Sequence, residues 1–278
     1  MMRGMFAAIS GLKTHQVMLD VTANDIANVN TIGYKSARTT FKDSLTQLQR
    51  GAAGATGVNG GSNAAQVGLG VTLGSIDNLM QGGALQSTNN PLDVAIQGEG
   101  FFRIGLAANP AGVPLATAGL EYTRAGNFTR NEAGYLTTQD GYYVVGRNAG
   151  GQDVALQVPP GASGVAIAQD GSVSYIPAGG GARVTVGMLS LATFSNSAGL
   201  ERASNNRWIP SANSGAETVG TPGNNGTGLT TAGAVEMSNV DLAQTFTTMI
   251  TAQRGFQANS RIISTSDEML QDLVNLKR

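Results

Sequence analysis

Residues that could perform acid–base or metal chemistry are few in this chain of 278 residues. His15 is the single histidine and cysteine is absent, so a Ser/His/Asp triad or a histidine metal site would depend on His15 alone. Asp93 and Glu99 lie near each other in sequence, but their segment offers no partner that would divide them into an acid and a base. Both read as turn residues. We expect no enzyme, and no catalytic, metal or cofactor site.

Three glycines in the segment GLGVTLG superficially resemble a phosphate-binding loop. Gly68, Gly70 and Gly74 are not followed by the lysine of a P-loop, and no strand-to-helix transition surrounds them. Turns or bulges within strands explain these glycines better. The segment therefore predicts no nucleotide cofactor.

The composition excludes other broad classes. Charged residues make up 13% of the chain, 39 residues are glycine, aromatic residues make up 5%, and the formal net charge is −1. Such a balance lacks the basic surface of a nucleic-acid-binding protein. No run of about 18 apolar residues is present, so we expect no membrane insertion, and the N-terminal residues lack the continuous apolar core of a signal peptide.

The elements that must position any functional side chain differ between the ends and the middle of the chain. Both ends carry residues at alternating steps of three and four, the heptad spacing of a helix that packs against a partner helix. The apolar positions that we expect at a self-assembly interface are Met5, Ile9, Leu12, Leu19 and Ile26, followed near the other end by Leu242, Phe246, Met249, Phe256, Ile263 and Leu270. Residues 1–33 and 235–278 are therefore predicted to form one helical, coiled-coil domain.

The middle of the chain has the pattern of β structure. Short alternating runs between turn residues follow one another from residue 67 to 214, which is typical of an antiparallel sandwich or irregular barrel. Asp140-Gly141 and Asp170-Gly171 are expected to form tight turns, and Ser238 or Asn239 to cap the last helix. Residues 34–66 and 215–234, rich in Gly, Ala and Asn, are predicted to be connecting segments. The predicted fold class is α+β, with an all-β domain inserted in a discontinuous helical domain.

Five ordered segments carry a resemblance that spans nearly the whole chain. They are ANDIANVNTIGYK, GGSNAAQVGLGV, TNNPLDVAIQGEGFF, YTRAGNFTRNEAGYLTTQDGYYVVG and the C-terminal VEMSNVDLAQTF…NLKR. The chain resembles the flagellar rod and hook proteins. The positions that match the N-terminal signature of that family are Asn28, Asn30, Thr31, Gly33, Tyr34 and Lys35.

The resemblance implies a structural function. Such subunits pass through the flagellar type III export apparatus and polymerise with copies of themselves, terminal helices inside around the export channel and β domain outside. The implied partners are rod, hook cap and hook-filament junction proteins, and the implied location is the extracellular hook and basal body.

The C-terminal NLKR and the stretch SARTTFKDSL favour a short-form hook subunit. The long segment from Gly33 to Val71 favours the alternative, a distal rod subunit. A secreted adhesin or surface-layer protein fits the heptad termini and the lack of a signal peptide less well, and a secreted hydrolase would need a catalytic constellation that the sequence does not show.

Overall fold

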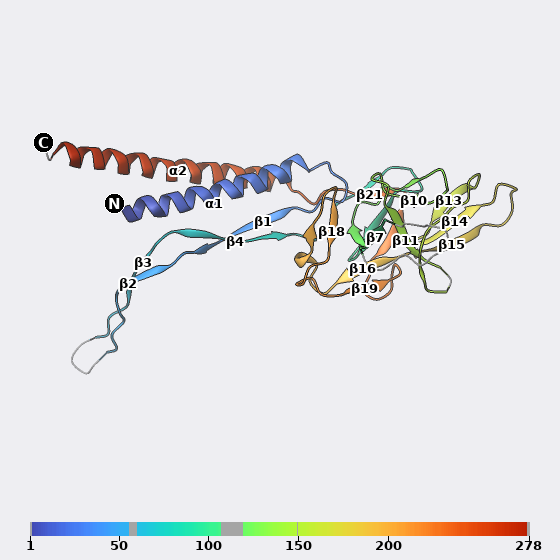
Figure 1. Cartoon of the computed structure of the whole chain (residues 1–278), viewed down its shortest axis with the longest axis horizontal. Helices are drawn as coiled ribbons and strands as arrows, with labels where there is room; N and C mark the ends of the chain where they lie inside the picture. Colours follow the sequence, from blue (N-terminus) through green and yellow to red (C-terminus); the bar gives the residue numbers. More distant parts are fainter. Residues whose placement is uncertain (1, 56–59, 107–118, 149, 277–278) are drawn as a thin grey trace. The chain divides into compact units, whose positions relative to one another are not determined.

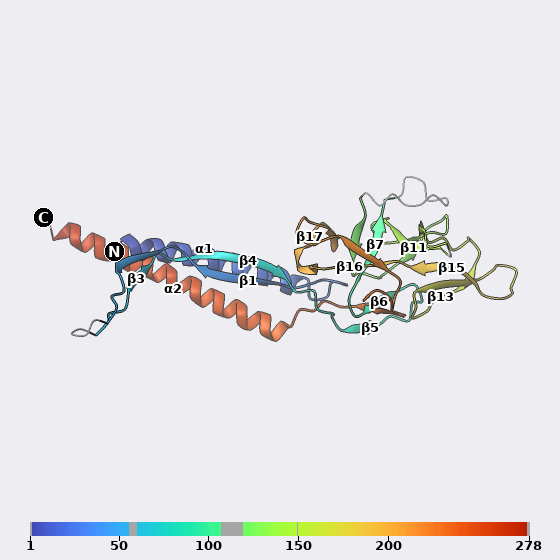
Figure 2. The same ribbon diagram turned by 90° about the horizontal axis from the view of Figure 1, so that it is seen from below.

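The computed structural model of the chain describes residues 2–55, 60–106, 119–148 and 150–276. The chain divides into two compact units (Figures 1 and 2). The helical unit consists of Met1–Ala27, Ala37–Asn78 and Asp241–Arg278, and the β unit consists of Asn28–Ser36 and Leu79–Val240. This division confirms the α+β class and the insertion of β structure between two terminal helices.

The helical unit contains α1 (Met2–Ala27) and α2 (Leu242–Asn275), which lie side by side and antiparallel (Figure 1). Asp241 begins α2, because its carboxylate accepts hydrogen bonds from the backbone N–H groups of Ala243 and Gln244 at 2.9 and 3.2 Å. The predicted cap at Ser238 or Asn239 is therefore wrong by two or three residues. Within the described residues, neither helix combines the length and apolar character that a membrane span requires.

A long β-hairpin completes the helical unit. β1 (Ala37–Asp43) pairs antiparallel with β4 (Val71–Asn78), and β2 (Thr46–Arg50) pairs antiparallel with β3 (Ala65–Gly68). A bridge between Ala53 and Ser62 extends the same pairing. Ser10 of α1 holds the hairpin, since its hydroxyl accepts the backbone N–H of Val71 at 3.2 Å.

The β unit is antiparallel in every described pairing. Its described residues form a 13-stranded sheet together with the small pairs β20–β6 and β21–β5. The elements are β5 (Leu85–Ser87), β6 (Val94–Gln97), β7 (Phe101–Gly105), β8 (Glu121–Thr123), β9 (Thr129–Arg130), β10 (Leu136–Thr137), β11 (Tyr143–Arg147), β12 (Asp153–Ala155), β13 (Ser163–Ile167), β14 (Ser172–Ile176), β15 (Val184–Leu189), β16 (Leu191–Phe194), the 3₁₀ turn η1 (Ser197–Gly199), β17 (Glu201–Arg202), β18 (Arg207–Ile209), β19 (Glu217–Gly220), β20 (Leu229–Ala232) and β21 (Ala234–Glu236).

Two apolar cores cover the opposite faces of the central strands. Successive side chains of a strand point to opposite faces, and accordingly Phe102 and Val144 belong to one core while Phe101 and Val145 belong to the other. Trp208 lies in the second core together with Phe101. The strands at the centre of the unit are thus buried on both sides.

A charged network crosses this interior at Arg103, whose side chain is fully buried. Its guanidinium donates to Asp153 at 2.6 Å and to both carboxylate oxygens of Glu217 at 3.2 Å. Tyr122 donates its hydroxyl hydrogen to Glu217 at 2.6 Å, and burial raises the pKa of Tyr122. The charges are therefore compensated within the unit.

The structure differs from the predicted domain boundaries. Residues 67–78, predicted within the β domain, belong to the helical unit, and residues 28–33 and 235–240, predicted within the helical domain, belong to the β unit. Residues 34–66 are not a free connector, because residues 34–36 belong to the strap described below and residues 37–43, 46–50 and 65–66 carry paired strands of the hairpin. Residues 56–59 of the predicted linker lie outside the described part. Residues 215–234 carry β19 and β20, which pair with β16 and β6. Paired backbone replaces the expected flexible segments.

Other local predictions are confirmed. Gly141 and Gly171 have φ values of 84° and 76°, the left-handed conformation that a turn after Asp140 or Asp170 requires. Asp93 accepts hydrogen bonds from Thr88 at 2.6 Å and from Asn90 at 3.0 Å, which is the expected turn role.

Candidate functional site: the helical assembly surface

The contact between α1 and α2 is made by small side chains. The buried residues of α1 are Ala8, Gly11, Thr14, Thr22 and Asp25, and those of α2 are Ala252 and Ser266. These positions again follow heptad steps, but on α1 the buried stripe lies one residue before the predicted seam. Gly11 lies against α2, whereas Asp25 lies against the hairpin, where its carboxylate accepts the backbone N–H of Ala37 at 3.3 Å.

Two glycines set how closely the helices approach. A Cβ atom on Gly11 would lie 2.7 Å from Asn259 Nδ2, and a Cβ atom on Gly255 would lie 2.6 Å from the His15 ring. His15 also contacts Phe41 of β1 edge to face, with ring centroids 5.7 Å apart. His15 is therefore a packing residue of the helical unit.

The predicted assembly residues of α1 are only half-buried. Met5, Ile9, Leu12, Leu19 and Ile26 lie beside the buried stripe and keep part of their apolar surface in solvent. Their burial is incomplete because Gly11 and Thr22, not the leucines, occupy the line of closest contact. The large apolar side chains of α1 remain available to a further partner.

α2 divides its predicted residues into two groups. Met249, Phe256, Ile263 and Leu270 are half-buried at heptad spacing along the side that faces α1, whereas Leu242 and Phe246 are exposed. Phe246 keeps 49% of its surface in solvent, and Ile250, which the sequence analysis did not single out, keeps 51%. The half-buried residues of α2 follow the heptad period, whereas Leu242, Phe246 and Ile250 lie outside the line of contact.

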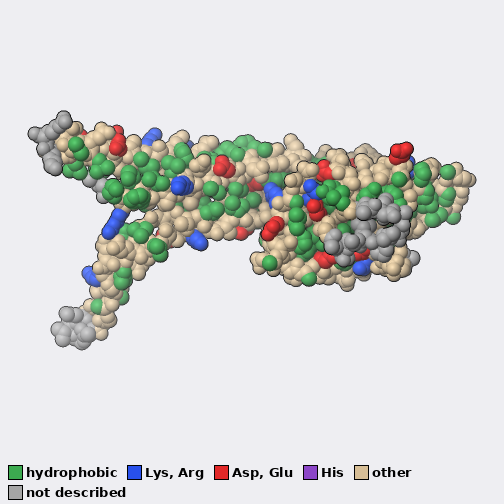
Figure 3. Space-filling view, viewed as in Figure 1, with side chains coloured by type: hydrophobic (Ala, Val, Ile, Leu, Met, Phe, Trp, Pro, Cys, Tyr) green, Lys and Arg blue, Asp and Glu red, His purple; other side chains and the backbone are tan. Residues whose placement is uncertain are grey.

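Many large apolar side chains of the two helices are exposed to solvent. Figure 3 shows hydrophobic side chains along the visible surface of both helices. The exposed large hydrophobic residues of the two helices are Met2, Phe6, Leu242, Phe246, Ile250, Ile262, Met269, Leu273, Val274 and Leu276. A chain that leaves so many large side chains in water on one element gains free energy when that element binds an apolar partner.

The hairpin adds to this surface. Leu45 and Leu48 on its first arm are 77% and 56% exposed, and Val67 and Leu69 on its second arm are also exposed. Isolated two-stranded hairpins are marginally stable in water, so an apolar hairpin of this length is suited to lie against another molecule. The hairpin is not evident in the sequence, because the Gly/Ala-rich segment between its arms shows no strand alternation.

The family signature lies elsewhere, in the β unit, where residues 28–36 form a strap across it. Gly33 has a φ of 68°, and a Cβ atom there would lie 2.6 Å from the backbone nitrogen of Ala125, so glycine is required. The Gly33 N–H donates to the carbonyl of Glu236 at 2.8 Å. Tyr34 is buried, and the guanidinium of Arg202 lies 4.8 Å from its ring centroid.

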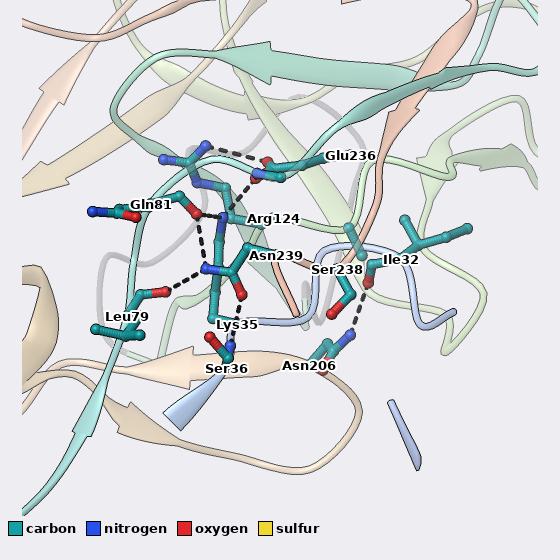
Figure 4. Close-up of polar contacts among 12 residues, drawn as sticks. Ile32, Lys35, Ser36, Leu79, Gln81, Arg124, Asn206, Glu236, Ser238 and Asn239 are labelled. Atoms are coloured by element: carbon teal, nitrogen blue, oxygen red, sulfur yellow. Dashed lines mark hydrogen bonds and ion pairs between the residues drawn. The ribbon is translucent and has the colours of Figure 1, made fainter. Parts of the chain in front are cut away.

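The remaining signature positions shape and anchor the strap. Thr31 donates its hydroxyl hydrogen to the side-chain oxygen of Asn28 at 3.1 Å, closing a local turn, and Asn30 is exposed. Lys35 extends into the interior, where its Nζ donates to Glu236 at 2.6 Å and to the carbonyl of Gln81 at 2.7 Å (Figure 4). Burial lowers the pKa of Lys35, outweighing the raising effect of Glu236.

Glu236 is the centre of these contacts. Its carboxylate accepts Lys35 and the guanidinium of Arg124 at 3.2 Å, and the N–H of Gly83 at 2.9 Å. All three ionised side chains are nearly inaccessible to water, at 0–1% exposure. The strap is thus anchored by buried charges. The sequence around Tyr34 and Lys35 does not indicate this role.

Comparisons with known proteins cover both ends and the middle of the chain. Residues 5–35 match the flagella basal body rod protein model, residues 95–175 match the flagellar hook protein FlgE/F/G D1 domain, and residues 231–276 match the flagellar basal body rod FlgEFG protein C-terminal model. The flagellar basal-body rod protein FlgG of Bacillus subtilis is 46% identical over 279 residues, with all of both chains covered.

The chain belongs to the flagellar rod and hook family. Members of this family are structural components of the flagellum, which agrees with the predicted structural function. The FlgG rod protein of Caulobacter vibrioides is 38% identical over 278 residues, covering 99% of this chain and all of the relative.

A hook protein in the same family is more distant. The flagellar hook protein FlgE of Borreliella burgdorferi is 27% identical over an alignment of 441 residues that covers both chains fully. This alignment is far longer than the 278 residues of this chain, whereas the alignments with the two rod proteins span 279 and 278 residues. The comparisons therefore favour the rod alternative over the hook reading that the NLKR ending suggested.

Proposed function

We propose that this chain is a subunit of the distal rod of the bacterial flagellum, a straight tube that transmits torque and encloses the export channel. The observation that carries the proposal is the full-length match to rod proteins at 46% and 38% identity, against 27% for a longer hook protein. The long segment from Gly33 to Val71 is compatible with it, since such a segment is associated with the straight rod as well as with some hooks.

Assembly uses the apolar face that one chain cannot cover. Side chains such as Phe246, Ile250 and Leu273 contribute on the order of 1.5 to 3 kcal/mol each when they are fully buried. Several such side chains on each subunit are enough to hold a polymer in which copies of α1 and α2 pack against one another. The occupant of this face is thus a second copy of the chain, and coiled-coil packing between copies is part of the proposal.

The β unit lies on the outside of the proposed tube and needs no partner for its own stability. Its two cores and its charged network are complete within one chain. The subunit leaves the cell through the type III export apparatus and joins neighbouring rod and hook proteins at the two ends of the rod. We also predict that both termini are largely disordered before assembly, because their apolar faces are covered only in the polymer.

Electron microscopy tests the proposal directly. Deletion of the gene is expected to leave cells without a distal rod, and purified polymer of this chain is expected to be straight. A curved polymer would assign the chain to the hook instead, and normal rods in the deletion strain would refute the rod assignment. Limited proteolysis of the monomer tests the termini, which should be cleaved well before the β unit.

A further inference from the structure

The chain passes between its two units four times, and the β unit gathers these passages at one place. The unit boundaries lie at 27/28, 36/37, 78/79 and 240/241. A single peptide connection rotates freely about φ and ψ. Four separate connections would therefore transmit twist poorly unless something fixes them against one another.

One side chain ties three of these passages together. The amide of Asn239 accepts the backbone N–H of Ser36 at 2.8 Å and donates to the carbonyls of Leu79 and Gln81 at 2.8 and 3.1 Å (Figure 4). The N–H of Leu79 also donates to the carbonyl of Ser36 at 2.8 Å. Ser36, Leu79 and Asn239 stand next to three different boundaries, so Asn239 uses its full amide to join segments that are far apart in sequence.

Buried charges reinforce the same place. Lys35, the residue before Ser36, reaches Gln81 and Glu236, and Glu236 lies three residues before Asn239. The fourth passage is held through the strap, because Asn206 donates its side-chain N–H to the carbonyl of Ile32 at 2.8 Å. We call Lys35, Ser36, Leu79, Gln81, Glu236 and Asn239 the junction cluster; all of them belong to the β unit.

We propose that the junction cluster fixes the four passages of the chain against one another. Torque applied to the helices then reaches the β unit and is not lost in rotation about the φ and ψ bonds of the separate connections. Asn239 is its key positioning residue. The proposal rests on the proposed rod function, because only a torque-bearing subunit needs a joint that resists twist. Hydrogen bonds that share one amide must break together, and the ion pair beside them is shielded from water and salt.

Hydrogen exchange of the purified full-length protein tests the structural half. In Asn239→Ala, the amide proton of Ser36 should exchange at least about tenfold faster, since about 1.4 kcal/mol of protection corresponds to tenfold. Core amides such as Val144 should not change. The matched control is Asn224→Ala, which removes an exposed contact with the neighbouring Thr221 and should leave Ser36 protected. Unchanged exchange at Ser36 in Asn239→Ala would overturn the proposal.

Rotation under load tests the functional half. Cells that carry Asn239→Ala should build rods of normal number and length, swim at the wild-type speed in dilute medium, and fall below half the wild-type speed in viscous medium. Wild-type speed in viscous medium with normal rods would refute the junction proposal alone. Complete rods in a strain that lacks the chain would instead refute the proposed function.

A second variant covers the case in which Asn239→Ala fails to fold, as reported by a shift in Trp208 emission. Asn239→Asp keeps the acceptor for Ser36 but loses both donations, to Leu79 and Gln81. The proposal expects Ser36 to keep its protection and loaded rotation to fall all the same. A folded Asn239→Asp variant that rotates normally under load would contradict it.

Discussion

The two units of this protein distribute their large apolar side chains in opposite ways. In the β unit, Phe101, Phe102 and Trp208 are at most 2% exposed and fill cores that one chain completes. In the helical unit, small residues such as Gly11 and Ala252 make the internal contact, and Phe246 and Ile250 remain in solvent. The difference indicates that the β unit can be stable within one chain, whereas the helices need a further apolar partner to cover their exposed side chains.

The largest expected effect is the loss of a core side chain. Phe102→Ala should lower the free energy of unfolding of the β unit by about 3 to 5 kcal/mol, because the emptied site is surrounded by rigid strands. Urea denaturation followed by the emission of Trp208, the single tryptophan, measures it. Phe246→Ala is the matched control and should change the same midpoint very little, since its ring is half in water. Equal losses for both variants would break the comparison.

The reverse pattern is expected for assembly. Phe246→Ala should raise the critical concentration for polymerisation about tenfold or more, because about 1.5 to 3 kcal/mol of burial is lost at each copy. Sedimentation of polymer from soluble subunits gives this concentration. Thr247→Ala, a change at an exposed polar position next to Phe246, is the control. Wild-type polymerisation by Phe246→Ala would show that this face is not the contact between copies.

A smaller effect is expected at the closest approach of the helices. Gly255→Ala should destabilise the helical unit by about 1 to 3 kcal/mol, because its Cβ would overlap the His15 ring, even though alanine favours a helix by about 1 kcal/mol over glycine. Hydrogen exchange of α1 amides in the assembled polymer, where the helices are ordered, measures it. Adding His15→Ala should restore the lost protection, and a double variant as unstable as the single one would show that the overlap is not the cause.

The smallest expected effect concerns pH. The pKa of Lys35 is lowered in the folded chain, so the unfolded chain binds more protons between that lowered value and 10.5. Stability should therefore rise with pH in this window through Lys35, and Lys35→Met should remove this contribution. Urea midpoints between pH 7 and 9, below the range in which Tyr122 would titrate in the unfolded chain, test this. Parallel pH profiles of the two proteins would contradict the buried state of Lys35.

The sequence predicts most strands of the β unit because their alternation is local. It also predicts the period of the helices, and Met249, Phe256, Ile263 and Leu270 do lie toward the partner helix. On α1 the buried residues lie one position before the predicted assembly residues, since apolar spacing marks which residues seek burial but not which partner buries them. Gly11 and Ala8 face α2, and the larger side chains beside them are left for other copies.

The strap and the hairpin could not be found by the same reasoning. Lys35 and Glu236 are 201 residues apart, and nothing in the local pattern around either residue indicates that they form a buried pair. β2 pairs with β3 across about 15 residues of sequence, and the Gly/Ala-rich stretch between them gives no local signal that the two strands meet. Contacts of this kind depend on the folded topology.

The antiparallel partnership of α1 with α2 carries a further meaning for synthesis. One helix is translated first and the other last, so a chain that ends prematurely anywhere in between possesses a folded β unit at most and has no second helix with which to pair. Incomplete products are thereby barred from incorporation by their own architecture. Only a chain that has been translated to its last helix can form the α1–α2 pair.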